Sequence, residues 1–169
     1  VFQDVFIRQS PALLFDAVPP VCSNASSFSL THAREVLGVP GSGRYAGTAV
    51  DAAGFFQPSV AGSGKHSVYY IFTSAQGCVD TIAQTVVVAP APRISAGPDQ
   101  TILSGGKVVL QATASSSGLQ YQWLPAAGLS NNQLLNPAAA PAAQVTYRLT
   151  ATSAEGCMAT DEVMVRVVP

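Results

Sequence analysis

Nine residues near the middle of the chain, TSAQGCVDT at positions 73–81, return almost unchanged as TSAEGCMAT at positions 152–160. Each copy leads into a valine-rich alternating segment, 86–88 in the first case and 163–167 in the second, and a proline follows soon after each segment. No helical pattern separates the copies. Such self-similarity with a period-2 alternation predicts two successive small β domains of the same design.

The repeat divides the 169 residues into parts. We expect a β-sandwich domain over residues 10–89, a proline-rich linker over 90–92 and a second sandwich over 93–169. Residues 1–9 resemble the last strand of a preceding repeat, or a leading strand of this one. Because the prolines of the linker withhold amide donors and favour extended backbone, we expect a short, semi-rigid connection between the domains.

Composition limits the classes of partner. Charged residues make up 10% of the chain against a usual figure of about 25%, the net charge is −1, and Lys and Arg form no cluster. Nucleic acid and anionic membranes both require a concentrated basic face, so neither is expected as a partner. No apolar run reaches the roughly 18 to 20 residues that a bilayer-spanning helix needs, which predicts no membrane insertion. A surface rich in Ser, Thr, Gln and Asn suits a secreted or cell-surface protein.

Alternation places the main strands. Residues 66–73 are apolar on both faces, which predicts a central strand, and 81–88 should be its hairpin partner. Residues 145–152 should line the core of the second domain. Residues 38–43 predict a glycine turn cluster, and 32–37 form a helix-tolerant stretch that we interpret as a solvated loop.

Trp123 is the only tryptophan of the chain and lies with Tyr121 in a predicted strand over residues 119–123. An indole on a central strand of a small sandwich fills the core in most cases, but it can also stack on a ligand. Both interpretations stay open from the sequence.

The three cysteines predict one covalent link. Cys22 begins the first domain and Cys78 lies in the Gly-Cys turn near its end, so a Cys22–Cys78 disulfide would stabilise the domain by roughly 4 kcal/mol on a chain-entropy estimate. Two buried free thiols are the alternative. Cys157 is then left over, either as a buried free thiol or as one that pairs between chains.

Motifs for phosphate and metal binding are weak. GSGK at residues 62–65 lacks the Ser or Thr that a phosphate loop needs, because His66 follows, and no helix comes after it. His32 and His66 have no Cys, Asp or Glu at metal-ligand spacing. We expect hairpin, loop and strand roles for these residues, and neither metal nor cofactor.

Catalytic carboxylates are equally scarce. Asp161 and Glu162 are adjacent, and neighbours on a strand point to opposite faces. No Gly-x-Ser-x-Gly elbow is present, so a Ser-His-Asp hydrolase is disfavoured. Asp51 and Asp99 could help to hold calcium, although too few acids cluster for a tight site. We therefore expect no catalytic residues and a non-enzymatic protein.

Several motifs in order resemble the PKD-like and Ig-like repeats of large secreted and cell-surface proteins of Bacteroidetes. The second domain carries AGPDQTI (96–102), YQWLPAAGLS (121–130), YRLT (147–150) and GC (156–157), and the first carries PVC (20–22), FQP (56–58) and GC (77–78). Two features depart from the pattern. Leu103 stands where such repeats commonly have a cysteine, which implies that Cys157 is orphaned, and the Trp-Asp-Phe-Gly-Asp-Gly signature of true PKD domains is missing.

The resemblance implies an all-β fold of two tandem Ig-like (PKD-like) β-sandwich domains, exported to the cell surface or medium, with no activity attached. It also implies that Asp80-Thr81-Ile82 is similar to a Bacteroidetes O-glycosylation acceptor. Thr81 is then the candidate glycosylated residue, although it could instead cap the adjoining turn.

Two functions follow as hypotheses. The first is a spacer, stalk or adhesive module whose partners are neighbouring repeats and a surface glycan or protein. The alternative is a carbohydrate-binding accessory module of a secreted polysaccharide-degrading enzyme, which requires Trp123 or Tyr45 to be exposed on a flat face. A catalytic domain would require a deep pocket with convergent polar groups.

Overall fold

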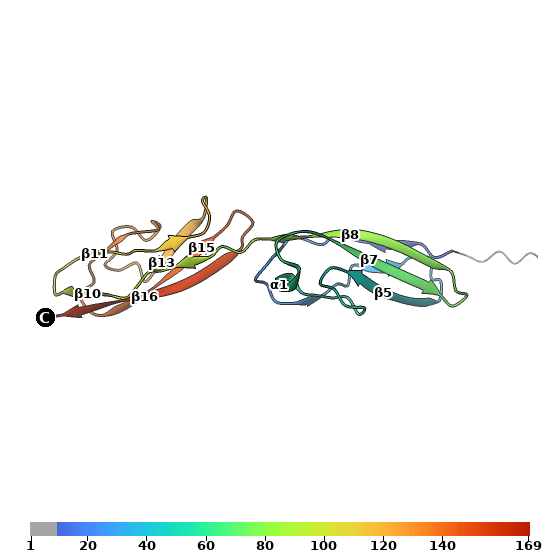
Figure 1. Ribbon diagram of the computed structural model, residues 1–169, viewed down its shortest axis with the longest axis horizontal. Coiled ribbons are helices and arrows are strands. Elements are labelled where there is room, and N and C mark those ends of the chain that lie inside the picture. Colours follow the sequence, from blue (N-terminus) through green and yellow to red (C-terminus); the bar gives the residue numbers. More distant parts are fainter. Residues whose placement is uncertain (1–9) are drawn as a thin grey trace, which may run out of the picture. The chain divides into compact units, whose positions relative to one another are not determined.

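The computed structural model describes residues 10–169, which fall into two compact units, the first ending at Pro90 and the second beginning at Ala91 (Figure 1). The predicted strand in residues 1–9 lies outside the described residues. Regular structure is almost entirely β, which confirms the predicted fold class. The helix among the described residues is the four-residue α1 (Pro58–Ala61).

The first unit is built on a four-stranded sheet in the order β2-β8-β7-β5. β7 and β8 form an antiparallel hairpin, β5 pairs antiparallel with β7, and β2 runs parallel to β8. Two small antiparallel sheets, β1 with β4 and β3 with β6, supply the opposite layer of the sandwich. The bounds are β1 (Leu13–Phe15), β2 (Val21–Cys22), β3 (Phe28–Ser29), β4 (Ala33–Glu35), β5 (Gly41–Gly47), β6 (Phe55–Phe56), β7 (Gly64–Ser74) and β8 (Val79–Ala89).

Alternating residues of both layers meet in the core of the first unit. Val68 of β7 and Val86 of β8 point inward from the main sheet, and Phe15 and Phe56 come from the small sheets. Burying such a side chain contributes roughly 1.5–3 kcal/mol relative to leaving it in water. β7 lies between β8 and β5, so the prediction of a central strand over 66–73 is confirmed.

The predicted glycine turn cluster over 38–43 holds only at Gly38, whose φ is +75°, because Gly41 to Gly47 form the edge strand β5. The side chains of Phe72 and Tyr70 on β7 occupy the space where Cβ atoms of Gly41 and Gly43 would lie. Gly43 is therefore required by the aromatic ring packed against it, and Gly41 by a ring together with the backbone carbonyl of Thr73; neither is required by a positive φ angle.

The segment 32–37 is likewise more ordered than a solvated loop. Residues 33–35 form β4, and the Glu35 carboxylate accepts hydrogen bonds from the backbone N–H groups of Ala12 (3.2 Å), Leu37 (3.0 Å) and Val39 (2.9 Å). Burial acts to raise the pKa of Glu35, but these donors together with the N–H of Gly38 hold it below its ordinary value. One carboxylate thus fixes the loop that precedes β5.

The second unit repeats the order of the main sheet as β10-β16-β15-β13, with β10 parallel to β16 and the other pairs antiparallel. The predicted strand 145–152 is confirmed, with β15 covering those residues. β9 pairs with β12 and β11 with β14 in the opposite layer. The bounds are β9 (Ile94–Ser95), β10 (Gln100–Leu103), β11 (Val108–Val109), β12 (Thr113–Ala114), β13 (Gln120–Leu124), β14 (Ala138–Ala139), β15 (Val145–Thr152) and β16 (Met158–Val168).

Trp123 is fully buried at the centre of the second core, together with Leu110, Tyr147, Leu149 and Val165. The prediction that the indole fills the core is therefore confirmed, and the ligand-stacking alternative is wrong. Burial raises the pKa of Tyr147, whose hydroxyl donates to the carbonyl of Ala127 at 2.9 Å.

The repeated nine residues form the same turn in both units. The N–H of Ser74 donates to the carbonyl of Cys78 at 2.8 Å, and that of Ser153 donates to Cys157 at 2.9 Å. The serine hydroxyls in turn accept from the cysteine N–H groups. The glycine before each cysteine has a φ near +80°. The sequence repeat is thus a hairpin turn that each unit uses to connect its two longest strands.

Candidate functional site

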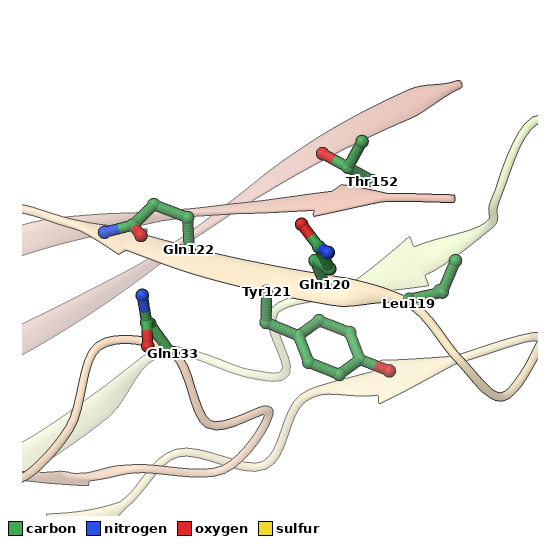
Figure 2. Close-up of a pocket in the computed structure, with 6 residues that line it drawn as sticks. All are labelled: Leu119, Gln120, Tyr121, Gln122, Gln133 and Thr152. Atoms are coloured by element: carbon green, nitrogen blue, oxygen red, sulfur yellow. The ribbon is translucent and has the colours of Figure 1, made fainter. Parts of the chain in front are cut away.

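A polar groove runs beside β13 in the second unit. Its volume is about 470 Å³, and Figure 2 shows the side chains that line it. They come from β13 and the residue before it, from the end of β15 and from the loop after β13. The lining residues are Leu119, Gln120, Tyr121, Gln122, Gln133 and Thr152.

Strand alternation distributes these side chains. Trp123 points into the core, so Tyr121, two residues earlier, points to the same side and packs half-buried against the core. Gln120 and Gln122 lie on the other side, where Gln120 pairs in register with Thr152 of β15. Figure 2 shows the Tyr121 ring and the Gln120 side chain leaving the strand in different directions. The groove therefore follows the edge of β13.

The loop of residues 125–136 is held against this edge by Trp123. The backbone N–H of Trp123 donates to the carbonyl of Asn132 at 2.8 Å, and the indole Nε1–H of Trp123 donates to the carbonyl of Leu134 at 3.0 Å. Gln133 lies between these two anchored residues, and its own N–H donates to Asn131 Oδ1 at 2.8 Å. Its carboxamide is thus presented from a fixed backbone.

The chemistry of the lining is neutral. All six side chains are uncharged, and the carboxamides of Gln120 and Gln133 have no hydrogen-bond partner among the described residues. A carboxamide both donates and accepts hydrogen bonds, as does the Thr152 hydroxyl. The groove is therefore suited to a neutral ligand rich in hydroxyl or amide groups.

The aromatic residues that the sequence singled out for sugar binding do not line this groove. Trp123 is completely buried and Tyr45 is only 8% exposed. Burial is the main cause that raises the pKa of the Tyr45 hydroxyl, and the neighbouring Tyr70 adds to it. Sequence reasoning placed Tyr121 beside Trp123 but missed its place in a groove. The glutamines that alternate with these aromatics were the available signal.

The cysteines correct the sequence prediction. Cys22 and Cys157 are both disulfide-bonded, and among residues 10–169 the free thiol is Cys78. The predicted Cys22–Cys78 bridge is therefore wrong, and so is the prediction of Cys157 as a free thiol. Cys157 is fully buried.

Strand length explains the error. Cys22 lies opposite Ala89 at the end of β8, whereas Cys78 immediately precedes the first residue of this strand. Eleven residues at about 3.3 Å each separate the two ends by roughly 35 Å. A disulfide requires Cα atoms roughly 4.4–6.8 Å apart. Cys22 and Cys78 therefore lie at opposite ends of the same sheet.

The remaining candidate residues are used structurally. Asp51 Oδ1 accepts from the N–H groups of Ala53 and Phe55, and Asp99 Oδ1 accepts from that of Met164. Within the described part of the chain, no group of three or more His, Cys, Asp or Glu residues could hold a metal ion.

The other predicted positions are also accounted for locally. His66 Nε2 lies 2.9 Å from the carbonyl of Gly62 at the start of the β7 hairpin, and His32 Nδ1 is buried without a partner. Asp161 accepts from the N–H of Ala96, whereas Glu162 pairs with Arg148. The two adjacent carboxylates thus have separate partners and do not form one site.

Thr81 is exposed on β8, and its N–H donates to Asp80 Oδ1 at 2.8 Å. The geometry leaves its hydroxyl accessible. No helix of residues 10–169 is long and apolar enough to cross a membrane.

No protein-family model and no curated protein matches this sequence. Similar solved structures include a C-terminal fragment of intimin in complex with the intimin-binding domain of its translocated receptor, at 11% identity and a TM-score of 0.52 over 94% of this chain and 63% of that one. The insect immune protein hemolin is similar at 10% identity and a TM-score of 0.49, over 98% and 49% of the two chains. A four-domain fragment of Drosophila N-cadherin is similar at 10% identity and a TM-score of 0.39, over 96% and 50%.

The chain thus spans about half the length of the hemolin and N-cadherin structures. At such low identity these likenesses concern the fold alone. The similar solved structures include Ig-like, cadherin and fibronectin-III-like β-sandwich domains, and the intimin fragment is similar in fold with a TM-score above 0.5.

Proposed function

We propose that this chain is a non-enzymatic extracellular segment of a secreted or surface-anchored bacterial protein, in which tandem PKD-like domains act as a spacer or as an adhesive module. The observation that carries the proposal is the repetition of one sheet order and one hairpin turn in both units. Modules built on one plan and joined in series are typical of stalks and adhesins.

Two further observations support export. Disulfide-bonded cysteines are typical of oxidising compartments, and two of the three cysteines are bonded. The charged fraction of 10% and the absence of basic clusters in the sequence fit a surface covered by neutral polar side chains. The intimin fragment, which was solved in complex with the intimin-binding domain of its receptor, resembles the chain in fold, and an adhesive role is proposed here from that likeness.

A domain exchange in the full-length protein tests the proposal. Residues 10–169 are replaced by two unrelated sandwich domains of the same total length, and surface location and adhesion of the cells are measured. Restored adhesion identifies a spacer, whereas lost adhesion with normal surface display identifies an adhesive module. Full-length protein found only in the cytoplasmic fraction would contradict the proposal.

The thiol state gives an independent check on export. Iodoacetamide treatment of the native protein should add one carbamidomethyl group, located at Cys78, because Cys22 and Cys157 are bonded. Three groups should appear after reduction. Three groups on protein taken directly from the cell surface, without reduction, would contradict an oxidised extracellular segment.

Thr81 extends the proposal as an O-glycosylation acceptor, supported by its exposed side chain and the adjoining Asp80. Protein from the native host should carry a glycan mass on the peptide that contains Thr81, and Thr81→Val should remove it. Thr85→Val, also exposed on β8, is the matched control and should leave the mass unchanged.

The carbohydrate-binding accessory module remains the second candidate. The two aromatics proposed for it, Trp123 and Tyr45, are buried, so these residues no longer favour it. The neutral groove beside β13 is the observation that does.

A further inference from the structure

We propose that the groove beside β13 binds a neutral saccharide, an inference that rests on the adhesive form of the proposed function and names its ligand. The site lies wholly within the second unit. Its lining combines three glutamine carboxamides, one threonine hydroxyl and one tyrosine ring. The residues are Gln120, Gln122, Gln133, Thr152 and Tyr121.

Charge narrows the ligand class first. No lining side chain is ionisable at neutral pH, and the nearby Arg148 of β15 pairs with Glu162 at 2.7 Å. A phosphate or sulfate would meet no cation in the groove, and a cationic ligand would meet no carboxylate. A ligand whose polar groups are neutral hydroxyls leaves no charge unpaired.

Hydrogen-bond capacity is the second step. Sugar hydroxyls donate and accept at once, and each carboxamide offers two donors and an acceptor in a fixed plane. Gln120 and Gln133 have carboxamides without partners among the described residues, so a ligand does not have to break existing bonds to reach them. Gln122 makes only a long contact of 3.4 Å to the Trp123 carbonyl.

Preorganisation is the third step. Gln133 belongs to a loop fixed on both sides by hydrogen bonds from Trp123, and Gln120 stands on a paired strand opposite Thr152. Tyr121 is half-buried against the core, which limits its ring to few orientations. A rigid site loses little conformational entropy when it binds. Aromatic carbon next to hydroxyl-binding groups also fits the mixed polarity of a sugar ring.

Strand addition by a peptide is the competing use of this edge, and the loop limits it. The outward N–H of Trp123 is already occupied by the carbonyl of Asn132. Because alternate residues face outward, only the backbone around Leu119 and Tyr121 remains open to a new strand. Such a short stretch offers few ladder hydrogen bonds, whereas the exposed carboxamides of Gln120 and Gln133 remain available.

Trp123 provides a built-in reporter, since it is the only tryptophan and its indole binds the residue next to Gln133. The 169-residue protein is titrated with cellohexaose, mannohexaose and hexa-N-acetylchitohexaose, with a heparin hexasaccharide and the blocked peptide acetyl-(Ser-Thr)3-amide as comparison probes. Indole fluorescence and backbone amide shifts are recorded. At least one neutral oligosaccharide should bind, with a Kd on the order of millimolar, and should shift the amides of residues 119–122 and 133.

Variants assign the site. The double variant Gln120→Ala with Gln133→Ala changes two exposed side chains and should weaken binding about tenfold or more with an unchanged melting transition. Gln144→Ala is the matched control, since this exposed glutamine precedes the far end of β15, and it should bind as the unaltered protein does. Tyr121→Phe keeps the packing and should weaken binding less than the double variant.

Three results would overturn the inference: no neutral oligosaccharide binds, the double variant binds as well as the control, or only the heparin probe or the peptide binds. These results are separable from a failure of the proposed function. If the domain exchange abolishes adhesion but no saccharide binds, the adhesive role stands and the ligand class is wrong. If a saccharide binds but the exchange restores adhesion, the groove is real and the adhesive role is wrong.

Discussion

The edge strands β5 and β13 hold the same place in the two units but carry opposite kinds of surface. In both, one buried aromatic donates its backbone N–H outward to a following loop, Tyr45 to Ala52 at 3.0 Å and Trp123 to Asn132 at 2.8 Å. Two residues earlier the first unit has Gly43, over which Tyr70 packs, and the second has Tyr121, which lines a groove. The two edge strands thus share one backbone arrangement, and the residue two positions before the buried aromatic decides whether the strand edge carries a groove.

The largest expected effect concerns the two buried aromatics. Trp123→Ala should destabilise the second unit by about 3–5 kcal/mol, because it leaves a large cavity and removes the hydrogen bond from the indole Nε1–H to Leu134. Tyr45→Ala should cost less, since Tyr45 is 8% exposed and its side chain is smaller. Urea unfolding followed by hydrogen exchange in each unit measures both changes.

Equal losses for these two variants would contradict the view that the second unit depends more on its aromatic. The control is Tyr147→Phe, which keeps the ring but removes its hydroxyl bond to Ala127. It should cost about 0.5–1.5 kcal/mol.

The second prediction tests why β5 is rich in glycine. Gly43→Val should destabilise the first unit by about 1–3 kcal/mol, because its side chain would enter space that Tyr70 fills. Ser42→Val, one residue earlier with an exposed side chain, is the matched control and should be neutral or slightly stabilising in a strand. Thermal unfolding by circular dichroism compares them. A tolerated Gly43→Val would mean that the rings move aside easily.

Local pattern was sufficient for the long strands and not for the features that depend on strand ends. Residues 145–152 and the 66–73 hairpin arm were predictable because alternation is a property of neighbouring residues. The pairing of Cys22 was not, since it depends on which end of the sheet each cysteine occupies. Strand direction and length decide that, and neither could be read from the spacing of cysteines.

The same distinction applies to β5 and to the groove. Glycines at 41 and 43 resemble a turn until the rings of Phe72 and Tyr70 are placed across from them. The groove depends on a loop that two hydrogen bonds from Trp123 hold in position. Both features arise from contacts between residues distant in sequence, which composition and periodicity do not encode.

The third prediction uses the repeated turn, where the two units should behave alike. Gly77 and Gly156 have φ angles of 82° and 80°, in a region that other residues enter at a cost. Gly77→Ala and Gly156→Ala should each destabilise their own unit by about 1 kcal/mol. Trp123 fluorescence follows the second unit, and hydrogen exchange in β7 follows the first. A clear difference between the two would show that the turns are not energetically equivalent.

The smallest expected effect is a pH dependence of the first unit that Glu35 produces at one pair of small strands. Beside the β1–β4 pair of the first unit, the Glu35 carboxylate accepts a hydrogen bond from the backbone N–H of Ala12. Beside the matching β9–β12 pair of the second unit, the Ser115 hydroxyl accepts one from the backbone N–H of Arg93 at 3.1 Å. The folded pKa of Glu35 is lowered. Its stabilisation is therefore complete above the unfolded value of about 4.3 and is lost as the pH falls through the lower folded value.

Glu35→Gln should accordingly destabilise the first unit at pH 7, and the effect should be smaller at pH 2, because the native carboxylate gains a proton as the pH falls through its lowered pKa. Ser115→Ala should change the second unit by the same amount at both pH values, because a hydroxyl does not titrate in this range. Urea unfolding of each variant against the unaltered protein at the two pH values measures the difference. A Glu35→Gln effect that is equally large at pH 2 would mean that the carboxylate acts through its shape and packing, and that its negative charge does not hold the loop before β5.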